Sequence, residues 1–329
     1  MLDTTAPWDT SAWLEEARAW IITTLEEHGL HIKGAVEQIH IRPWSTILRT
    51  QTNKGQFFFK AAAPFLDYEP ALLDLLTRLY PDNSPDLLKI DLSRGWILMG
   101  DSGIPLRTFI KADKNVDRWH DIVTLYVRLQ KEMVSHVDKI LHLGVFDRRL
   151  ESLPEKFELL VSDQSGMLLD QHGGLTSDEY QRLKSMRENF RQMCAELSAY
   201  GIPATLHHDD FHDGNVFLQG NHVIFTDWGE SAIAHPFFTL VVMLRGVENS
   251  LDLTPEALEV ASVRKWYLAE WQDYMPLSDL QRAAVLAEQI GLVNRAITWR
   301  HVISNMPTMQ KPEYLIAVPS YLKDFIDSL

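Results

Sequence analysis

A polar loop followed by a short apolar hairpin constrains this 329-residue chain more than any other feature. The loop, residues 207–215, is rich in His and Asp, and two apolar runs follow it on either side of Gly220-Asn221. A two-residue Gly-Asn connection between such runs is typical of a tight β-hairpin. Pairing of the two runs would bring Asn215 and Asp227 together at the open end of the hairpin.

The residue types that meet there indicate a particular chemistry. Hard divalent cations such as Mg²⁺ take oxygen ligands, which Asn215 and Asp227 supply. A separate carboxylate that does not bind the metal, Asp210, can accept a proton from an attacking hydroxyl group. The spacing from His208 through Asp210 to Asn215, with Asp227 following in Asp-Trp-Gly, is the pattern that kinases use for phosphoryl transfer.

At these residues the chain resembles the aminoglycoside phosphotransferase family, small-molecule kinases that share the protein-kinase-like fold. The family's loop usually reads H-G-D-x-H-x-x-N, and His208, Asp210, His212 and Asn215 match it. Asp209 departs from the pattern because the family usually has Gly there. This departure leaves the expected base and ligands in place, and it bears on the local backbone conformation.

The resemblance implies an ATP-dependent, Mg²⁺-dependent phosphotransferase that acts on a hydroxyl group of a small molecule. Asp210 and His208 are the expected catalytic residues: Asp210 accepts the hydroxyl proton or orients that oxygen, and His208 holds the loop in shape. Asn215 and Asp227 are the expected metal ligands. Two alternatives stay open, a catalytically weak kinase-like nucleotide-binding protein and a metal-dependent hydrolase that uses the His and Asp cluster.

Upstream of the loop, the sequence predicts a small antiparallel sheet behind an amphipathic helix over residues 11–28. Aromatic and β-branched residues gather in short runs that turn-forming residues separate. The five expected strands are residues 37–41, 46–50, 56–60, 87–90 and 96–99. A second helix, which opens near Glu69-Pro70, is expected to extend through Tyr80.

The resemblance also implies nucleotide-binding roles for this region. Kinases pair a Lys of the third strand with a Glu of the following helix, so Lys60 and Glu69 are expected to pair and to orient the phosphates. The first loop, residues 42–45, has no Gly-x-Gly, and its backbone N–H groups and the Ser45 hydroxyl are the expected phosphate contacts. The linker that follows the sheet implies nucleotide contacts from Leu98, Met99 and Asp101.

Beyond residue 105 the pattern changes to amphipathic helices, expected over 116–141, over 176–200 and from Thr254 onward. His235, in an A-x-x-x-H-P segment, is expected to be structural. The predicted fold class is therefore α+β: a protein-kinase-like bilobal fold with a small N-terminal antiparallel five-stranded sheet lobe and a larger, mainly helical C-terminal lobe. The expected domains are residues 1–100 and 105–329, joined by a linker at 101–104.

Charge and cysteine content limit the partners. The formal net charge of −14 would repel nucleic acid and anionic lipid, so neither a nucleic acid nor a membrane is an expected partner. It slightly favours a cationic acceptor, as do Asp209, Asp213 and Glu230, although acidity also simply keeps proteins soluble. A single cysteine and the lack of a signal peptide or membrane-length apolar run predict a cytoplasmic protein. The acceptor's identity, the choice of ATP or GTP and the oligomeric state are not indicated.

Overall fold

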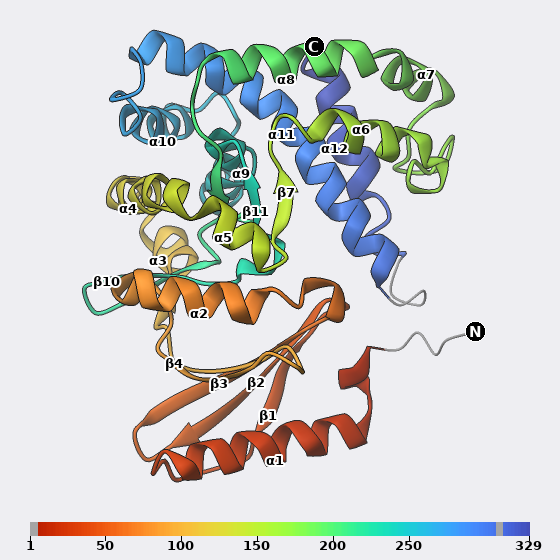
Figure 1. Ribbon diagram of the computed structural model, residues 1–329. Helices are drawn as coiled ribbons and strands as arrows, with labels where there is room; N and C mark the ends of the chain where they lie inside the picture. The colour runs from red at the N-terminus through yellow and green to blue at the C-terminus, as the bar shows by residue number, and fades with distance from the viewer. Residues whose placement is uncertain (1–5, 307–311) are drawn as a thin grey trace. The chain divides into compact units, whose positions relative to one another are not determined.

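The computed structural model describes residues 6–306 and 312–329 (Figure 1). Within these residues the chain divides into two compact units. Unit 1 comprises residues up to 104, residues 217–229 and a short segment that begins at Ser304, and unit 2 comprises the remainder. That residues 1–100 and 105–329 act as separate nucleotide-binding and catalytic domains stays a prediction.

Unit 1 is built on a five-stranded antiparallel sheet with the strand order β1-β2-β3-β5-β4. Its strands are β1 (Glu37–Ile41), β2 (Ser45–Thr52), β3 (Gly55–Ala62), β4 (Leu87–Asp91) and β5 (Trp96–Gly100). Two helices belong to the same unit, α1 (Ser11–Glu27) and α2 (Glu69–Leu79). The five predicted strands and the two predicted helices are therefore present.

Helix α1 covers one face of this sheet (Figure 1). The Thr10 side chain accepts a hydrogen bond from the Trp13 backbone N–H and so caps the helix. The apolar side of α1 packs against Phe59, Trp96 and Leu98, and these side chains are almost completely buried. Because successive side chains of a strand point to opposite faces, Lys60 lies on the face away from α1.

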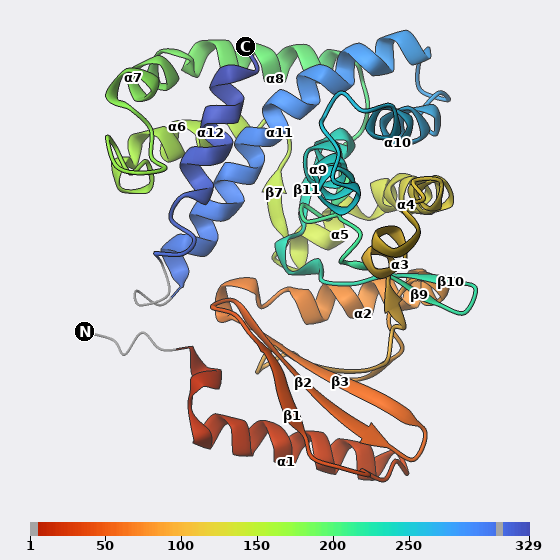
Figure 2. The same ribbon diagram turned by 180° about the vertical axis from the view of Figure 1, so that it is seen from behind.

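The predicted hairpin is confirmed by β9 (Val216–Gln219) and β10 (His222–Phe225), which Gly220-Asn221 connects (Figure 2). Gly220 has a φ of +61°, as such a turn requires. The hairpin continues into a three-stranded sheet with β6 (Ile104–Pro105). Asn215 directly precedes β9, and Asp227 follows β10 by two residues.

Unit 2 is mainly helical and contains one small sheet, in which β11 (Ala232–Ala234) runs parallel to β7 (Phe146–Arg148) and antiparallel to β8 (Thr205–His207). None of the described helices is long and apolar enough to cross a membrane. The helices are α3 (Leu106–Asp113), α4 (Arg118–Met133), α5 (Val137–His142), α6 (Leu153–Ser162), α7 (Ser177–Ser185), α8 (Arg187–Ala199), α9 (Thr239–Leu251), α10 (Leu258–Ala269), α11 (Leu277–Asn305) and α12 (Ala317–Asp327).

Three predicted helix limits were wrong. The helix expected over 116–141 is interrupted by a 3₁₀ turn at Val134–His136, and the one expected over 176–200 is divided at Met186. A 3₁₀ turn keeps apolar residues at three-residue spacing, so periodicity does not reveal the break. The helix expected from Thr254 begins at Leu258, because residues 254–257 form a turn instead. Helix α7 begins with a capping box, in which the Thr176 side chain accepts from the Glu179 backbone N–H and the Glu179 side chain accepts from the Thr176 backbone N–H.

Candidate active site

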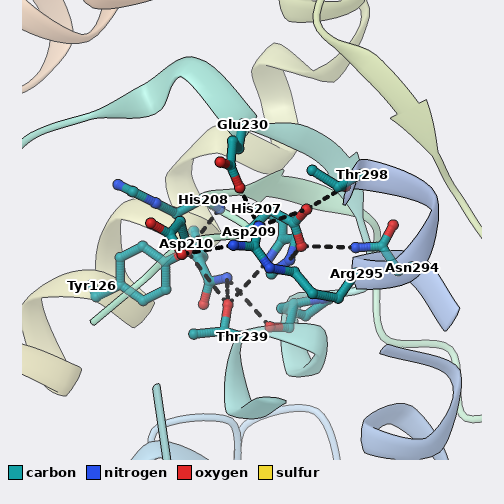
Figure 3. A network of polar contacts seen from close by, with 12 residues as sticks. Tyr126, His207, His208, Asp209, Asp210, Glu230, Thr239, Asn294, Arg295 and Thr298 are labelled. Atoms are coloured by element: carbon teal, nitrogen blue, oxygen red, sulfur yellow. Dashed lines mark hydrogen bonds and ion pairs between the residues drawn. The ribbon is translucent and has the colours of Figure 1, made fainter. Parts of the chain in front are cut away.

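The polar loop begins where β8 ends, in the interior of unit 2 (Figure 3). His208 is completely buried, and its backbone N–H donates to the Tyr126 hydroxyl of α4 at 3.2 Å. The Tyr126 ring stacks on Phe211 with centroids 3.8 Å apart. Helix α4 thus holds the loop through one hydrogen bond and one aromatic contact, and the expected loop-holding role of His208 stays a prediction.

Helix α9 contacts the same loop at its first residue. The Thr239 hydroxyl lies 3.1 Å from Nδ1 of His207, and Nε2 of that ring lies 3.0 Å from Oδ1 of Asp209. His207 and Thr239 are each 1% exposed, so water does not compete for these contacts. The imidazole ring of His207 therefore connects α9 to the loop.

Asp209 adopts a left-handed backbone conformation with φ of +60°, which is uncommon for a residue other than glycine. Its buried carboxylate accepts from the amide of Asn294 at 2.9 Å and from the hydroxyl of Thr298 at 2.5 Å. Burial alone would raise the pKa of Asp209, but the hydrogen bond from His207 and the charge of Arg295 outweigh it and lower the pKa to about 2. Asp209 is therefore ionised, and its carboxylate binds the loop to Asn294 and Thr298.

Both carboxylate oxygens of Asp210 have partners in unit 2. Oδ1 accepts from Arg295 at 2.8 Å, and Oδ2 accepts from the Asn215 amide at 3.2 Å. Nε2 of His212 lies 3.5 Å from Oδ2. Burial opposes the ionised form, yet the positive charge of Arg295 holds the pKa of Asp210 well below its usual range. Asp210 is consequently a carboxylate at neutral pH and can only accept hydrogen bonds.

Arg295 is the buried cation of this cluster. Its guanidinium group bonds to Oε2 of Glu230, as well as to Asp210, and lies 3.5 Å from Oδ2 of Asp209. Burial raises the pKa of Glu230, and the negative charges of Asp210 and Asp209 raise it further. Arg295 lowers this pKa, but the net result is a pKa of about 7. Three carboxyl groups, those of Asp209, Asp210 and Glu230, thus lie around one guanidinium group.

Helix α3 contacts the far end of the loop. Arg107 donates from Nε to the buried Asp213 carboxylate at 2.8 Å and lies 3.2 Å from Nδ1 of His212. The Gly214 backbone N–H also donates to Nδ1 of His212, at 3.0 Å. Because Nδ1 accepts from two donors, a neutral His212 carries its proton on Nε2, the nitrogen that faces Asp210.

In unit 1, the predicted pair of Lys60 and Glu69 is confirmed, and a third residue joins it. Nζ of Lys60 lies 2.5 Å from Oε1 of Glu69 and 2.5 Å from Oδ1 of Asp227. The Lys60 and Glu69 side chains are 8% and 4% exposed, whereas that of Asp227 is 52% exposed. Burial alone would lower the pKa of Lys60, but the two carboxylates reverse this effect and raise it. The ammonium group is therefore permanently charged.

The other expected nucleotide contacts lie in or directly after strands of unit 1. Ser45 is the first residue of β2 and is almost buried. The Leu98 side chain is packed in the core under α1, so any nucleotide contact from Leu98 must come from its backbone. Met99 is half-buried, and Oδ1 of Asp101 accepts from the Gly103 backbone N–H at 2.9 Å. Their roles toward a nucleotide stay predictions.

The hydrolase alternative requires a cluster of His and carboxylate ligands. Throughout residues 6–306 and 312–329, no group of three or more His, Cys, Asp or Glu side chains is arranged to hold a metal ion. The ring nitrogens of His207 contact Thr239 and Asp209 instead, and Nδ1 of His212 accepts from Gly214.

Sequence reasoning missed the residues that hold the loop from outside: Arg107, Tyr126, Thr239, Asn294, Arg295 and Thr298. A signal for two of them is present. Asn294 and Arg295 interrupt a helical segment whose neighbours, such as Val293 and Ala296, are apolar and buried. A cation and an amide within a buried helical segment indicate partners in the core.

Comparisons with known proteins place this geometry in context. Residues 140–277 match the sequence model of the phosphotransferase enzyme family. A comparison with curated proteins finds no match. The match over residues 140–277 confirms the resemblance and the predicted phosphotransferase class.

Solved structures are similar over almost the whole chain. Macrolide 2′-phosphotransferase type I has a TM-score of 0.60 at 15% identity, with 95% of this chain and 97% of that chain covered. Plasmodium vivax ethanolamine kinase has a TM-score of 0.62 at 13% identity, with 100% and 99% covered. The GDP complex of wild-type aminoglycoside 2′-phosphotransferase-IIIa has a TM-score of 0.57 at 15% identity, with 93% and 99% covered. At these identities the likeness concerns the fold, and it confirms the predicted fold class.

Proposed function

Because residues 140–277 match the phosphotransferase enzyme family, we propose that this protein uses ATP and Mg²⁺ to phosphorylate a hydroxyl group of a small molecule. The observation that carries the proposal is the state of Asp210. This residue lies inside the matched segment, and Arg295 and Asn215 hold its carboxylate in one orientation. A fixed, ionised carboxylate is what phosphoryl transfer to a hydroxyl group needs beside the acceptor.

We propose that Asp210 orients the acceptor hydroxyl more than it removes its proton. A general base works best when its pKa lies near the working pH, and Arg295 holds the pKa of Asp210 far below that range. A hydrogen bond from the acceptor hydroxyl to Oδ2 would aim the oxygen at the phosphorus. Positioning of this kind supplies much of the rate in phosphoryl transfer.

The nucleotide phosphates are assigned to Lys60, whose charge Glu69 and Asp227 stabilise. Ser45 and the backbone near it would add contacts, and the adenine would meet the backbone from Leu98 to Asp101. The GDP in the relative's structure belongs to that protein. For this chain, ATP is the proposed nucleotide, and competition between ATP and GTP tests that choice.

Asn215 and Asp227 are the proposed Mg²⁺ ligands. Carboxylate and amide oxygens suit a hard cation, and the Asn215 amide nitrogen donates to the backbone oxygen of Asp210 at 2.9 Å and to its carboxylate. We assign the ligand role to the amide oxygen of Asn215 and to the carboxylate of Asp227, whose side chain is 52% exposed. A bound Mg²⁺ would neutralise charge on the transferred phosphoryl group.

The acceptor is a small molecule with a hydroxyl group, and its charge is open to test. Asp209, Asp213 and Glu230, which favoured a cationic acceptor in the sequence, are paired with side chains of their own unit. A cationic acceptor stays a prediction, but these three residues no longer support it. The cytoplasm, proposed from the low cysteine content, is the expected compartment.

Consumption of ATP across a panel of macrolides, aminoglycosides, amino alcohols and sugars tests the proposal. Asp210→Asn should cut turnover by about 10²-fold or more and leave Mg²⁺–ATP affinity nearly unchanged. Asp138→Asn, on the exposed surface of α5, is the matched control and should transfer phosphate at the parental rate. Parental turnover in Asp210→Asn would remove this residue from its role.

A catalytically weak nucleotide-binding protein is the second candidate. The observation that favours it is the first loop, residues 42–45, which has no Gly-x-Gly. Tight binding of Mg²⁺–ATP together with negligible turnover against the whole panel would support this candidate over the kinase.

A further inference from the structure

Helix α11 reaches the polar loop through three side chains on adjacent turns. Asn294 and Thr298 both donate to the Asp209 carboxylate, and Arg295 donates to the Asp210 carboxylate (Figure 3). Residues three or four apart lie on one side of a helix, so Asn294 and Thr298 face Asp209 together. All three lie beyond residue 277, outside the segment that matches the family.

The loop is strained at the residue that α11 contacts. A left-handed backbone is unfavourable for a residue other than glycine, because its Cβ comes close to the following carbonyl oxygen, and Asp209 adopts this conformation while almost completely buried. Its carboxylate has three hydrogen-bond donors, His207, Asn294 and Thr298. These contacts compensate for the backbone conformation, so the strained turn depends on the presence of α11.

Contacts other than those with the loop also hold the Arg295 side chain in place. Its guanidinium group bonds to Glu230 and lies 5.6 Å from the centre of the Trp299 ring, one helical turn further along α11. A planar guanidinium group with two fixed neighbours presents its remaining N–H groups in a defined direction. Through the 2.8 Å bond it engages Oδ1 of Asp210, which leaves Oδ2 toward Asn215 and His212.

We propose that α11 positions the reacting carboxylate: Asp209 anchors the helix to the loop, and Arg295 determines which oxygen of Asp210 meets the acceptor hydroxyl. Arg295 is thus a positioning residue that acts through Asp210. The inference rests on the proposed function, because it takes Asp210 as the group that orients the acceptor. Neither the family match nor the spacing of the loop residues assigns any role to α11.

The first experiment is independent of activity. Amide hydrogen exchange over residues 207–215 is compared between the parent, Arg295→Met, Arg295→Lys and Arg300→Met. Arg300 also lies on α11, and it is ion-paired with Asp163, a residue outside the loop. Exchange should rise about tenfold or more in Arg295→Met and stay parental in Arg300→Met. Parental exchange in Arg295→Met would overturn the inference.

Arg295→Lys covers the case in which Arg295→Met does not fold. Lysine keeps the charge but cannot engage Asp210 and Glu230 in one planar group, so exchange in this variant should lie between those of the parent and the Met variant. Asp209→Asn, which keeps the shape of the anchor but not its charge, should also accelerate exchange over 207–215.

The second experiment measures turnover with the acceptor that the ATP-consumption panel identifies. Arg295→Met should lower kcat about 10²-fold with little change in KM for Mg²⁺–ATP, because the acceptor is misplaced while the nucleotide is not. In Arg295→Ala, millimolar guanidinium ion should restore part of kcat. A parallel change of kcat and KM without rescue would overturn the positioning role.

The two experiments separate the two claims. If the parent phosphorylates nothing in the panel, the proposed function fails, and the positioning role in catalysis fails with it, whereas the exchange experiment still decides whether α11 orders the loop. If the parent is active and Arg295→Met retains parental kcat, the proposed function stands and the positioning role fails.

Discussion

Substitution of Lys60 by Met is expected to destabilise unit 1 in a way that depends on pH. In the parent, the Lys60 ammonium group is the cation bonded to Glu69, whose side chain is 4% exposed. Removal of one partner of a buried ion pair typically lowers the free energy of unfolding by about 3–5 kcal/mol, because the other charge is left without compensation. Loss of the ion pair with Asp227 adds little to this decrease in the free energy of unfolding, since the Asp227 side chain is 52% exposed and solvent screens its charge.

The sign of the pH dependence follows from Glu69. Burial raises the pKa of Glu69 in the parent, and Lys60 is the main influence that lowers it. Without Lys60 the folded-state pKa rises further above the unfolded value, so the folded protein retains a proton that the unfolded chain releases. Stability then falls as pH rises through this interval, and the deficit of Lys60→Met should be larger near pH 8 than near pH 5.

Urea denaturation followed by tryptophan fluorescence measures these differences, because Trp96 is a buried residue of strand β5 and Trp13 packs against the same core. Lys54→Met, at an exposed lysine in the turn between β2 and β3, is the control and should change stability by less than about 0.5 kcal/mol. The double variant Lys60→Met, Glu69→Met should regain most of the loss, since no buried charge remains. Equal deficits near pH 5 and pH 8, or none near pH 8, would refute the reasoning.

Two further predictions concern other parts of the chain. Gly103→Ala should destabilise the protein by about 2 kcal/mol or more in the same urea assay, because φ is +95° there and an added Cβ would lie 2.2 Å from the Leu218 backbone oxygen. Gly34→Ala is the control, because nothing lies within 4 Å of a Cβ added there. Equal loss of stability in the two variants would contradict the predicted clash. Burial and the neighbouring His207 lower the pKa of His235 to about 3, so its imidazole signals in NMR should not titrate between about pH 5 and 8. Below about pH 6.5 the unfolded chain binds a proton on His235 that the folded chain excludes, so His235 should make the free energy of unfolding fall as the pH decreases from that value. An NMR titration midpoint of His235 near about pH 6.5 would contradict its burial.

The local parts of the candidate site were predictable from sequence. Gly220-Asn221 between two apolar runs indicated the hairpin, and the spacing from Asp210 to Asn215 matched the loop of the phosphotransferase family. In the structure the Asn215 amide contacts the Asp210 carboxylate at 3.2 Å. Such predictions succeed because turn chemistry and short spacings act over a few residues. The pairing of Lys60 with Glu69, nine residues apart, also followed from the resemblance.

The long-range parts were not predictable from the same signals. Arg295 is 85 residues from Asp210 in the chain, and helical periodicity shows which side of α11 is buried but not what that side meets. Asp209 illustrates the limit from the other direction. Its difference from the family pattern was visible in the sequence, whereas its contacts with Asn294 and Thr298 depend on how α11 packs. Tertiary packing decides such partners.

The contacts with the loop require α11 to have one particular rotation about its own axis. The helix continues for 29 residues without interruption, and Arg295 lies well inside it. Each residue turns a helix by about 100°, so a single inserted or deleted residue before Arg295 would rotate its guanidinium group away from the carboxylates unless the preceding segment shifted by the same amount. Length variation in this part of the chain is therefore expected at the loops before Leu277, where it leaves the rotation of the helix unchanged.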